Sequence, residues 1–230
     1  MARQMTQRIQ SARRRLFIVD DHPIFRDGLA HLVNGERDLQ VCGEADSAGA
    51  ALDGVLRSKP ALVLIDIGLP GKSGLELIKD LRVACPEAAV LVISMHEESL
   101  YAERVLRAGA QGYLMKQEGP EKMLRAIRDV LNGRISLSEQ MSAKVLNIFA
   151  GQRPARGASP IEQLTDREFE ILQLIGRGKG NHEIACQLHV SSKTVDAHRS
   201  HIKQKLKLRS SPELICYAAR WVEANNTPSR

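Results

Sequence analysis

Five polar side chains stand at or near the ends of short apolar runs, and their types suit them to chemistry. They are Asp20, Asp21, Asp66, Ser94 and Lys116. Short runs rich in Val, Ile and Leu are typical of strands buried on both faces of a parallel sheet. Because parallel strands bring their carboxyl ends to one edge, we expect these side chains to form a single site. One Asp alone would more often cap a strand or a helix.

Three clustered carboxylates repel one another, so the predicted site calls for a cation. Oxygen ligands of this kind suit Mg²⁺, which keeps several waters and often pairs with phosphate. Lys116 would add a fixed positive charge for an anion. A metal, a lysine and a protruding carboxylate such as Asp66 favour transfer of a phosphoryl group onto that carboxylate. The sequence has neither a GxxxxGK[ST] nor a GxGxxG motif, so a nucleotide is not the indicated ligand.

The elements that must position these side chains are strands that alternate with helices. The expected strands cover residues 16–20, 39–44, 61–66, 88–94 and 111–116. The expected helices cover residues 23–33, 47–57, 74–84, 99–108 and 118–133. This alternation predicts an α/β doubly wound sheet with right-handed βαβ units, and we favour the flavodoxin-like strand order 2-1-3-4-5.

The rest of the chain predicts helices only. Residues 135–149 read as a linker helix, and the Gly, Pro and Arg content of residues 150–160 indicates a flexible tether. Thr165 and Glu168 form a capping box at the start of a helix. Asn181 is expected to cap a short second helix, and Ser191 a third that runs to about Leu206. A fourth is expected over residues 212–223, and together these helices predict a helix-turn-helix.

The third helix has two different faces. Val195, Ile202 and Leu206 fall on one side and are expected in the core. The other side is basic, with short side chains near its N-terminus, and carries Lys193, Asp196, Ala197, Ser200, Lys203, Gln204 and Lys207. A recognition helix needs such groups for base edges and phosphates, although a solvated helix face has the same composition. His189, His198 and His201 are interpreted as packing or capping groups, not metal ligands.

Composition limits the classes of protein that this chain can belong to. Of its 230 residues, 43% are hydrophobic and 26% charged, and no apolar run reaches the roughly 18 residues of a membrane span. Residues 1–15 are basic without an apolar core, so they are not a secretory signal and we expect a disordered tail in a cytoplasmic protein. The four cysteines are scattered without a CxxC pair, which indicates free thiols. The net charge of the whole chain is +6, but residues 16–135 carry more acidic than basic side chains. This uneven distribution indicates an acidic sensing domain joined to a basic, anion-binding domain.

Residues 16–135 resemble the receiver domain of two-component response regulators. The resemblance is carried by Asp20 and Asp21, by Asp66 followed by Pro70 and Gly74, by Ser94, and by Tyr113 with Lys116. It implies that Asp66 accepts a phosphoryl group, and that Mg²⁺ is bound by Asp21, Asp66 and the Gly68 carbonyl, with Asp20 acting through water. It also implies that Ser94 and Lys116 bind the phosphoryl group and that Tyr113 is an aromatic switch that turns inward on activation. Gly68 and His96 occupy the two positions that tune dephosphorylation in the family.

Residues 161–225 resemble the LuxR/NarL-type helix-turn-helix. The carrying residues are Leu164-Thr-Asp-Arg-Glu168, Glu170-Ile-Leu172, Gly178, Asn181, Glu183-Ile-Ala185, and Ser192-Lys-Thr-Val195 with His198, Ile202, Lys205 and Leu206. The resemblance implies that Asp196, Ala197 and Ser200 face bases. It implies that Lys193, Thr194 and Lys203 contact phosphates, and that the last helix is a dimer surface. In resembling proteins the unphosphorylated receiver covers the recognition helix or blocks dimerisation.

The two resemblances together indicate a response regulator of the NarL/FixJ family, a phosphorylation-switched transcription factor and not an enzyme. We divide the chain into a basic tail (1–15), a receiver domain with a flavodoxin-like (βα)5 fold (16–135), a linker helix and tether (136–160) and an all-α DNA-binding domain (161–230). The implied partners are a histidine kinase, promoter DNA and a second copy of the chain, with RNA polymerase as a further candidate.

Two alternative functions remain open from the sequence. One is an enzyme that forms an aspartyl-phosphate, but a haloacid-dehalogenase-like enzyme would want a second Asp at position 68, where this chain has Gly68. The other is a constitutive DNA-binding regulator with an inactive receiver, against which the intact set of acidic, hydroxyl and lysine residues argues.

Overall fold

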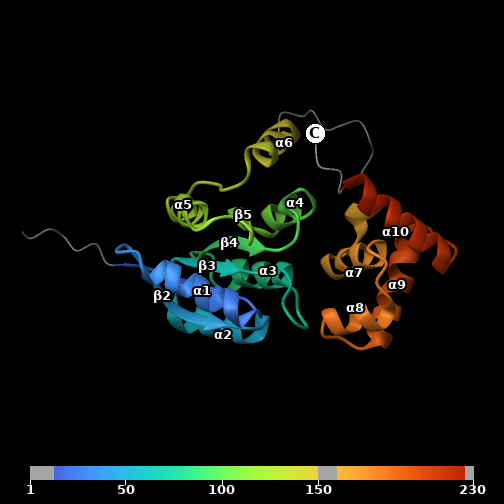
Figure 1. Cartoon of the computed structure of the whole chain (residues 1–230), viewed down its shortest axis with the longest axis horizontal. Coiled ribbons are helices and arrows are strands. Elements are labelled where there is room, and N and C mark those ends of the chain that lie inside the picture. The colour runs from blue at the N-terminus through green and yellow to red at the C-terminus, as the bar shows by residue number, and fades with distance from the viewer. Residues whose placement is uncertain (1–12, 150–159, 226–230) are drawn as a thin grey trace, which may run out of the picture.

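The computed structural model describes residues 13–149 and 160–225 (Figure 1). The basic tail predicted for residues 1–15 lies outside the described residues except at its end, where Arg14 and Arg15 open the first strand. The predicted tether also lies outside them, apart from Pro160. None of the described helices is both long enough and apolar enough to cross a membrane.

A five-stranded parallel sheet forms the centre of the N-terminal α/β domain, which runs from β1 to α5. Its strands are β1 (Arg14–Val19), β2 (Leu39–Ala45), β3 (Leu62–Ile65), β4 (Ala89–Ser94) and β5 (Gly112–Met115). They lie side by side in the order β2-β1-β3-β4-β5, and each neighbouring pair is parallel. The predicted flavodoxin-like order is therefore confirmed.

Helices cover both faces of the sheet (Figure 1). They are α1 (Pro23–Asn34), α2 (Ala48–Ser58), α3 (Gly74–Ala84), α4 (Glu98–Ala108) and α5 (Pro120–Leu131). Leu16 and Ile18 of β1 belong to the core that also holds α1 and α5, whereas Phe17 and Val19 belong to the core under α2, α3 and α4. Strands buried on both faces leave only their ends for polar side chains, which places the site at the sheet edge.

A tight turn after β3 fixes the backbone at the chemically important end of that strand. A Cβ added to Gly74 would lie 2.2 Å from the carbonyl oxygen of Asp66, so only glycine allows α3 to start this close to the strand. The N–H of Gly74 donates to the Ile67 carbonyl at 3.0 Å. The spacing between Asp66 and Gly74 therefore positions the Asp66 backbone.

The segment after α5 runs along the outer edge of β5. Ser136 bridges Gly112 in parallel, accepting a hydrogen bond from the Tyr113 N–H and donating one to the Gln111 carbonyl. The linker helix α6 (Glu139–Phe149) therefore begins later than predicted, because residues 135–138 are held in extended form beside the sheet. The Ser138 N–H donates to the Glu98 carboxylate at 2.9 Å, which ties this segment to α4.

The C-terminal helical domain, over its described residues, consists of the four predicted helices and of the 3-10 turn η1, which was not predicted. Their bounds are η1 (Pro160–Gln163), α7 (Asp166–Gly176), α8 (Asn181–Gln187), α9 (Ser192–Leu206) and α10 (Ser211–Asn225). The predicted caps at Thr165 and Ser191 are confirmed, since each side chain accepts an N–H from the third residue of its helix. The predicted cap at Asn181 is wrong: Gly180 is the N-cap of α8. The amide of Asn181 instead binds Arg199 and Asp196 on α9.

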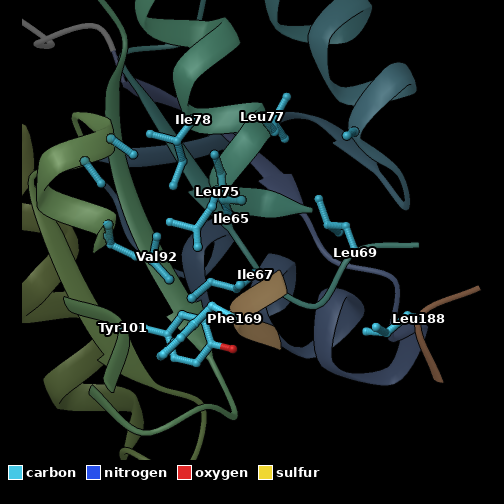
Figure 2. Packing of buried hydrophobic residues seen from close by; sticks show 14 of the residues in the cluster. Ile65, Ile67, Leu69, Leu75, Leu77, Ile78, Val92, Tyr101, Phe169 and Leu188 are labelled. Atoms are coloured by element: carbon cyan, nitrogen blue, oxygen red, sulfur yellow. The ribbon is translucent and has the colours of Figure 1, made fainter. Parts of the chain in front are cut away.

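One hydrophobic core continues from the α/β domain into the helical domain. Phe169 of α7 packs edge-on against Tyr101 of α4, with ring centroids 5.3 Å apart, and the two rings lie together beside Ile67 in Figure 2. Trp221 of α10 packs against the same Phe169 ring at 5.3 Å. The two domains are therefore joined by side-chain packing as well as by the chain.

Candidate functional site

The carboxyl edge of the sheet brings four of the five predicted side chains into direct contact. The ammonium nitrogen of Lys116 lies 2.7 Å from Asp20 Oδ2 and 2.6 Å from Asp66 Oδ2. The hydroxyl of Ser94 donates to Asp66 Oδ1 at 2.8 Å. All four residues are buried, so Asp66 has a buried cation and a buried hydroxyl as immediate neighbours.

Burial and charge pairing act in opposite directions at this edge. Burial alone would lower the pKa of Lys116, but the charges and hydrogen bonds of Asp66 and Asp20 outweigh it and raise the pKa. Burial and the neighbouring Asp66 charge raise the pKa of Asp20, against the opposing contact with Lys116. Lys116 therefore remains an ammonium at neutral pH and holds two carboxylates close together.

The acidic part of the site has a donor set that fits a divalent cation. Asp20, Asp21, His22 and Asp66 each offer one ligand atom, all within 4.8 Å of one another. Asp21 Oδ1 is buried and accepts no hydrogen bond from the described part of the chain, although His22 Nδ1 lies 2.7 Å away. Carboxylate oxygens of this kind suit Mg²⁺. The presence of His22 at the site did not follow from the sequence pattern, although it directly follows the two Asp residues.

Tyr113 is already turned inward in this structure. Its ring is buried, and its hydroxyl donates to the backbone carbonyl of His96 at 2.7 Å. Burial raises the pKa of the Tyr113 hydroxyl, so it stays protonated and keeps this hydrogen bond. The inward ring coexists with direct contacts from Ser94 and Lys116 to Asp66, and the role of Tyr113 as an aromatic switch stays a prediction.

The helical domain closes one side of the site. A cavity of about 330 Å³ lies over Asp66, and its walls come from both domains. The α/β domain contributes Asp66, Ser94 and His96 among others, and the helical domain contributes α7 and the turn between α8 and α9. Nothing in the sequence pattern pointed to this enclosure.

Charged side chains hold α7 against the α/β domain. Asp166, the first residue of α7, accepts Lys79 of α3 at 2.8 Å and Arg104 of α4 at 3.3 Å. Arg104 also donates to the carbonyls of Leu164 at 3.0 Å and Ile161 at 2.8 Å, and its guanidinium lies 4.1 Å from the centre of the Phe169 ring. Arg104 is thus the side chain of α4 that binds the start of the helical domain.

A second arginine, on α7 of the helical domain, also contacts both domains. Arg167 of α7 donates to the Gly71 carbonyl in the loop after β3 at 3.2 Å and to the Leu188 carbonyl at 2.7 Å. It also pairs with the buried Glu170 at 2.7 Å. The loop that follows Asp66 is therefore linked directly to the turn of the helix-turn-helix.

The predicted nucleic-acid face of α9 is open to solvent. Lys193, Asp196, Ala197 and Ser200 are exposed, and Thr194 and Lys203 are half-buried. Val195, Ile202 and Leu206 are buried as predicted. The Asp196 carboxylate binds the Asn181 amide, and the Thr194 hydroxyl bonds Ser191 at 2.8 Å, so these two groups already have partners in the chain.

Of the two expected forms of control, cover of the recognition helix is not seen in this arrangement, and a block of dimerisation stays a prediction. Among the described residues, the contacts between the domains involve η1, α7, the start of the α8–α9 turn and Trp221 of α10, and the outer residues of α9 stay exposed. The recognition helix stays open because the ion pairs of Arg104 and Lys79 with Asp166 place α7, and not α9, beside the site.

The histidines of α9 lie near the start of α7. His198, His201 and Glu168 offer ligand atoms within 4.8 Å of one another. Glu168 is already engaged, because its carboxylate pairs with Lys205 at 2.6 Å and accepts the Thr165 N–H at 2.8 Å. The predicted packing or capping role of the histidines stays a prediction, and the contacts of Glu168 are made by Lys205 and Thr165.

Two family models match the chain. Residues 16–128 match the response regulator receiver domain, and residues 162–218 match the bacterial regulatory proteins of the luxR family. The oxygen regulatory protein NreC of Staphylococcus haemolyticus is 36% identical over 210 residues, which cover 90% of this chain and 97% of that protein. NreC of Staphylococcus aureus strain MRSA252 is 38% identical over the same shares.

The solved structures agree with this match. A LuxR-family two-component response regulator from Aurantimonas is 32% identical, with a TM-score of 0.56, over 60% of this chain and 99% of that one. RcsB from Salmonella enterica serovar Typhimurium has the same fold, with 24% identity and a TM-score of 0.60 over 90% of this chain and 99% of that one. The chain belongs to the two-component response regulators that join a receiver domain to a LuxR-type DNA-binding domain. It is a phosphorylation-dependent transcriptional regulator.

Proposed function

We propose that Asp66 is the phosphoacceptor and that its phosphorylation controls dimeric binding of the helical domain to promoter DNA. The observation that carries the proposal is the contact of the Asp66 carboxylate with Lys116 at 2.6 Å and Ser94 at 2.8 Å. Asp20, the other buried acid, contacts Lys116 but has no hydroxyl beside it in the described structure. A phosphoryl group on Asp66 would therefore lie beside both a cation, Lys116, and a hydrogen-bond donor, Ser94.

The transfer step follows from these contacts. An oxygen of Asp66 attacks phosphorus, the bond from phosphorus to the donor breaks, and the donor atom leaves with the bonding electrons. Both Asp66 oxygens accept hydrogen bonds, so one contact is lost and Ser94 or Lys116 then donates to a phosphoryl oxygen instead. Mg²⁺, bound by Asp21, Asp66 and the Gly68 carbonyl with Asp20 acting through water, would neutralise charge on the transferred group.

The donor and the target are assigned by chemistry and family. We assign a histidine kinase as the phosphodonor and double-stranded promoter DNA as the target, bound by a homodimer in the cytoplasm. RNA polymerase is assigned as a further partner. We assign no enzymatic turnover to the chain itself. RcsB, which shares the fold, has been solved on promoter rprA with the phosphomimetic BeF₃⁻, and as two dimers on two parallel DNAs. The exposed apolar side chain of Ile215 on α10 supports a dimer surface there.

On DNA, α9 supplies the contacts. Asp196, Ala197 and Ser200 are assigned to bases, and Lys193, Thr194 and Lys203 to phosphates. The exposure of the outer face supports this role. Because the α/β domain contacts α7 and leaves α9 open, control by phosphorylation would act through the position of the helical domain and its dimer surface, not by direct cover of α9.

Labelling with a small donor tests the assignment of Asp66. The full chain is incubated with acetyl phosphate and Mg²⁺, and an acyl phosphate is recognised by its lability to base and hydroxylamine. Asp66→Asn should abolish the label, whereas Asp53→Asn, the same change at an exposed carboxylate on α2, should leave it intact. Undiminished labelling of Asp66→Asn would remove Asp66 from its proposed role. The rival, a constitutive regulator, would show equal DNA affinity with and without the label.

A further inference from the structure

The helical domain places a buried carboxyl group in the cavity over Asp66. Glu170 of α7 is 5% exposed and lines that cavity together with Asp66. Its Oε2 pairs with Arg167 at 2.7 Å, whereas its Oε1 is buried and makes no hydrogen bond with the described residues. Burial, and after it the Glu170 charge, raises the pKa of the Tyr101 hydroxyl on α4. The Glu170 carboxyl group therefore lies in the contact between the two domains.

This contact leaves other polar groups unsatisfied as well. The Tyr101 hydroxyl and the Gln173 amide nitrogen are both buried, and neither makes a hydrogen bond within the described part of the chain. A buried polar group without a partner costs free energy, because it has lost its hydrogen bonds to water. Separation of the domains would let water reach this part of the interface. The contact is therefore poised to open when a further cost is added.

The balance of charge in the cavity is acidic. Three carboxyl groups line it, those of Asp21, Asp66 and Glu170. Arg177 lines it too, but this side chain is exposed, so water and salt screen its charge. The other titratable groups around Glu170 are His22, His96 and His189 on the cavity wall, Asp166 on α7 and Glu76 on α3. A phosphoryl group on Asp66 would add negative charge to a cavity that is already acidic.

We propose that Glu170 couples phosphorylation to separation of the domains: the phosphoryl group on Asp66 repels the Glu170 carboxylate and drives α7 away from the α/β domain. The proposal rests on Asp66 being the phosphoacceptor and names how that site is read by the helical domain. A phosphoryl group on a side chain carries about 1.5 to 2 negative charges at neutral pH, against one on the free carboxylate. Glu170 can respond by binding a proton or by leaving the cavity with α7.

The two responses of Glu170 depend on pH in opposite ways. Burial raises its pKa to about 7 while the domains are in contact, against the opposing effect of Arg167. An exposed glutamate has a pKa near 4.3, so Glu170 releases a proton on separation, and rising pH favours separation. A nearby phosphoryl group raises the pKa of Glu170 further in the contact. At pH 6 phosphorylation therefore meets a neutral carboxyl group, whereas at pH 8 it meets a carboxylate and repels it.

The DNA affinity of the full chain, with and without labelling by acetyl phosphate and Mg²⁺, tests the proposal at pH 6 and pH 8. In wild type, the gain in affinity on labelling should be about fivefold larger at pH 8, as a further rise of one pKa unit gives. Glu170→Gln keeps the size and an acceptor for Arg167 but has no charge, so its gain should be the same at both pH values. Glu121→Gln, the same change at an exposed residue of α5, is the matched control and should behave as wild type.

The amount of acyl phosphate, measured in each sample, separates the possible failures. If wild type and Glu170→Gln are labelled equally and gain the same affinity at both pH values, the coupling through Glu170 is wrong and the role of Asp66 stands. An equal gain of wild type at pH 6 and pH 8 would overturn the coupling without any variant. If wild type gives no acyl phosphate, the proposed function itself fails.

Discussion

Replacing Arg104 by alanine should release the helical domain from the α/β domain. The change removes hydrogen bonds to Ile161 and Leu164, the ion pair with Asp166 and the stacking on Phe169. A net hydrogen bond contributes about 0.5–1.5 kcal/mol and a cation–π contact about 0.5–2 kcal/mol. Because these terms share one side chain and do not add fully, we expect a loss of about 3 kcal/mol, or roughly a hundredfold shift towards separated domains.

The only tryptophan of the chain reports this separation. Trp221 packs on Phe169 and lines the groove between the domains together with Arg104 and Asp166. Separation exposes that side of its ring to water, so the fluorescence emission of Arg104→Ala should shift to longer wavelength. Binding to DNA without phosphorylation should strengthen in parallel, measured by footprinting on an operator with two half-sites.

Arg107→Ala is the matched control for Arg104→Ala. It lies three residues further along α4, lines the same groove and pairs with Glu103 at 2.6 Å, with the two side chains 54% and 38% exposed. An exposed pair of this spacing contributes about 0.3–0.5 kcal/mol, so its loss should leave the emission and DNA binding near wild type. If both variants give the same emission and the same DNA affinity, Arg104 does not hold the domains together and the reasoning is refuted.

Three further predictions have defined outcomes. Gly74→Ala places a Cβ 2.2 Å from the Asp66 carbonyl, so it should destabilise the fold by several kcal/mol in urea unfolding and slow labelling; Gly49→Ala, where a Cβ meets nothing within 4 Å, should not. Burial raises the pKa of Glu170 from its ordinary value of about 4.5 to about 7, against the opposing effect of Arg167. The folded state therefore holds a proton that the unfolded state releases, and stability should fall by up to about 3 kcal/mol as pH rises from about 4.5 to about 7. Glu170→Gln should flatten that slope in unfolding curves, and an unchanged slope would contradict it. Lys193→Ala should weaken binding to all DNA sequences and reduce the salt dependence by about one unit, whereas Ser200→Ala should change preference among sites; equal effects on random and specific DNA would contradict the assigned face.

Much of the fold follows from the sequence because local patterns determine it. The apolar runs placed every strand to within a residue or two, and the Thr165 and Ser191 caps marked where α7 and α9 begin. The juxtaposition of Asp20, Asp66, Ser94 and Lys116 also followed, because the ends of parallel strands share one edge. Asn181 misled the prediction because a residue suited to capping can instead bind across to a neighbouring helix, here to Arg199.

The contact between the domains did not follow from the sequence. Arg104 and Asp166 are 62 residues apart, and each alone reads as an ordinary solvated charge on a helix. Gln173 looks like a polar position on an amphipathic helix until α7 is packed against the sheet edge, which buries it. The inward position of Tyr113 likewise depends on a carbonyl supplied by the loop after β4, at His96. Such features depend on tertiary packing, which no periodicity encodes.

The pairing of Ser136 with β5 determines how copies of this chain can meet. An outer strand leaves N–H and C=O groups unpaired, and these invite a strand from another molecule to extend the sheet. On this side, the Tyr113 N–H and the Gln111 C=O are already bonded to Ser136. A second copy would therefore have to displace Ser136 to continue the sheet across β5. Association at that side through side chains needs no such displacement and can be reversed without breaking a shared backbone ladder.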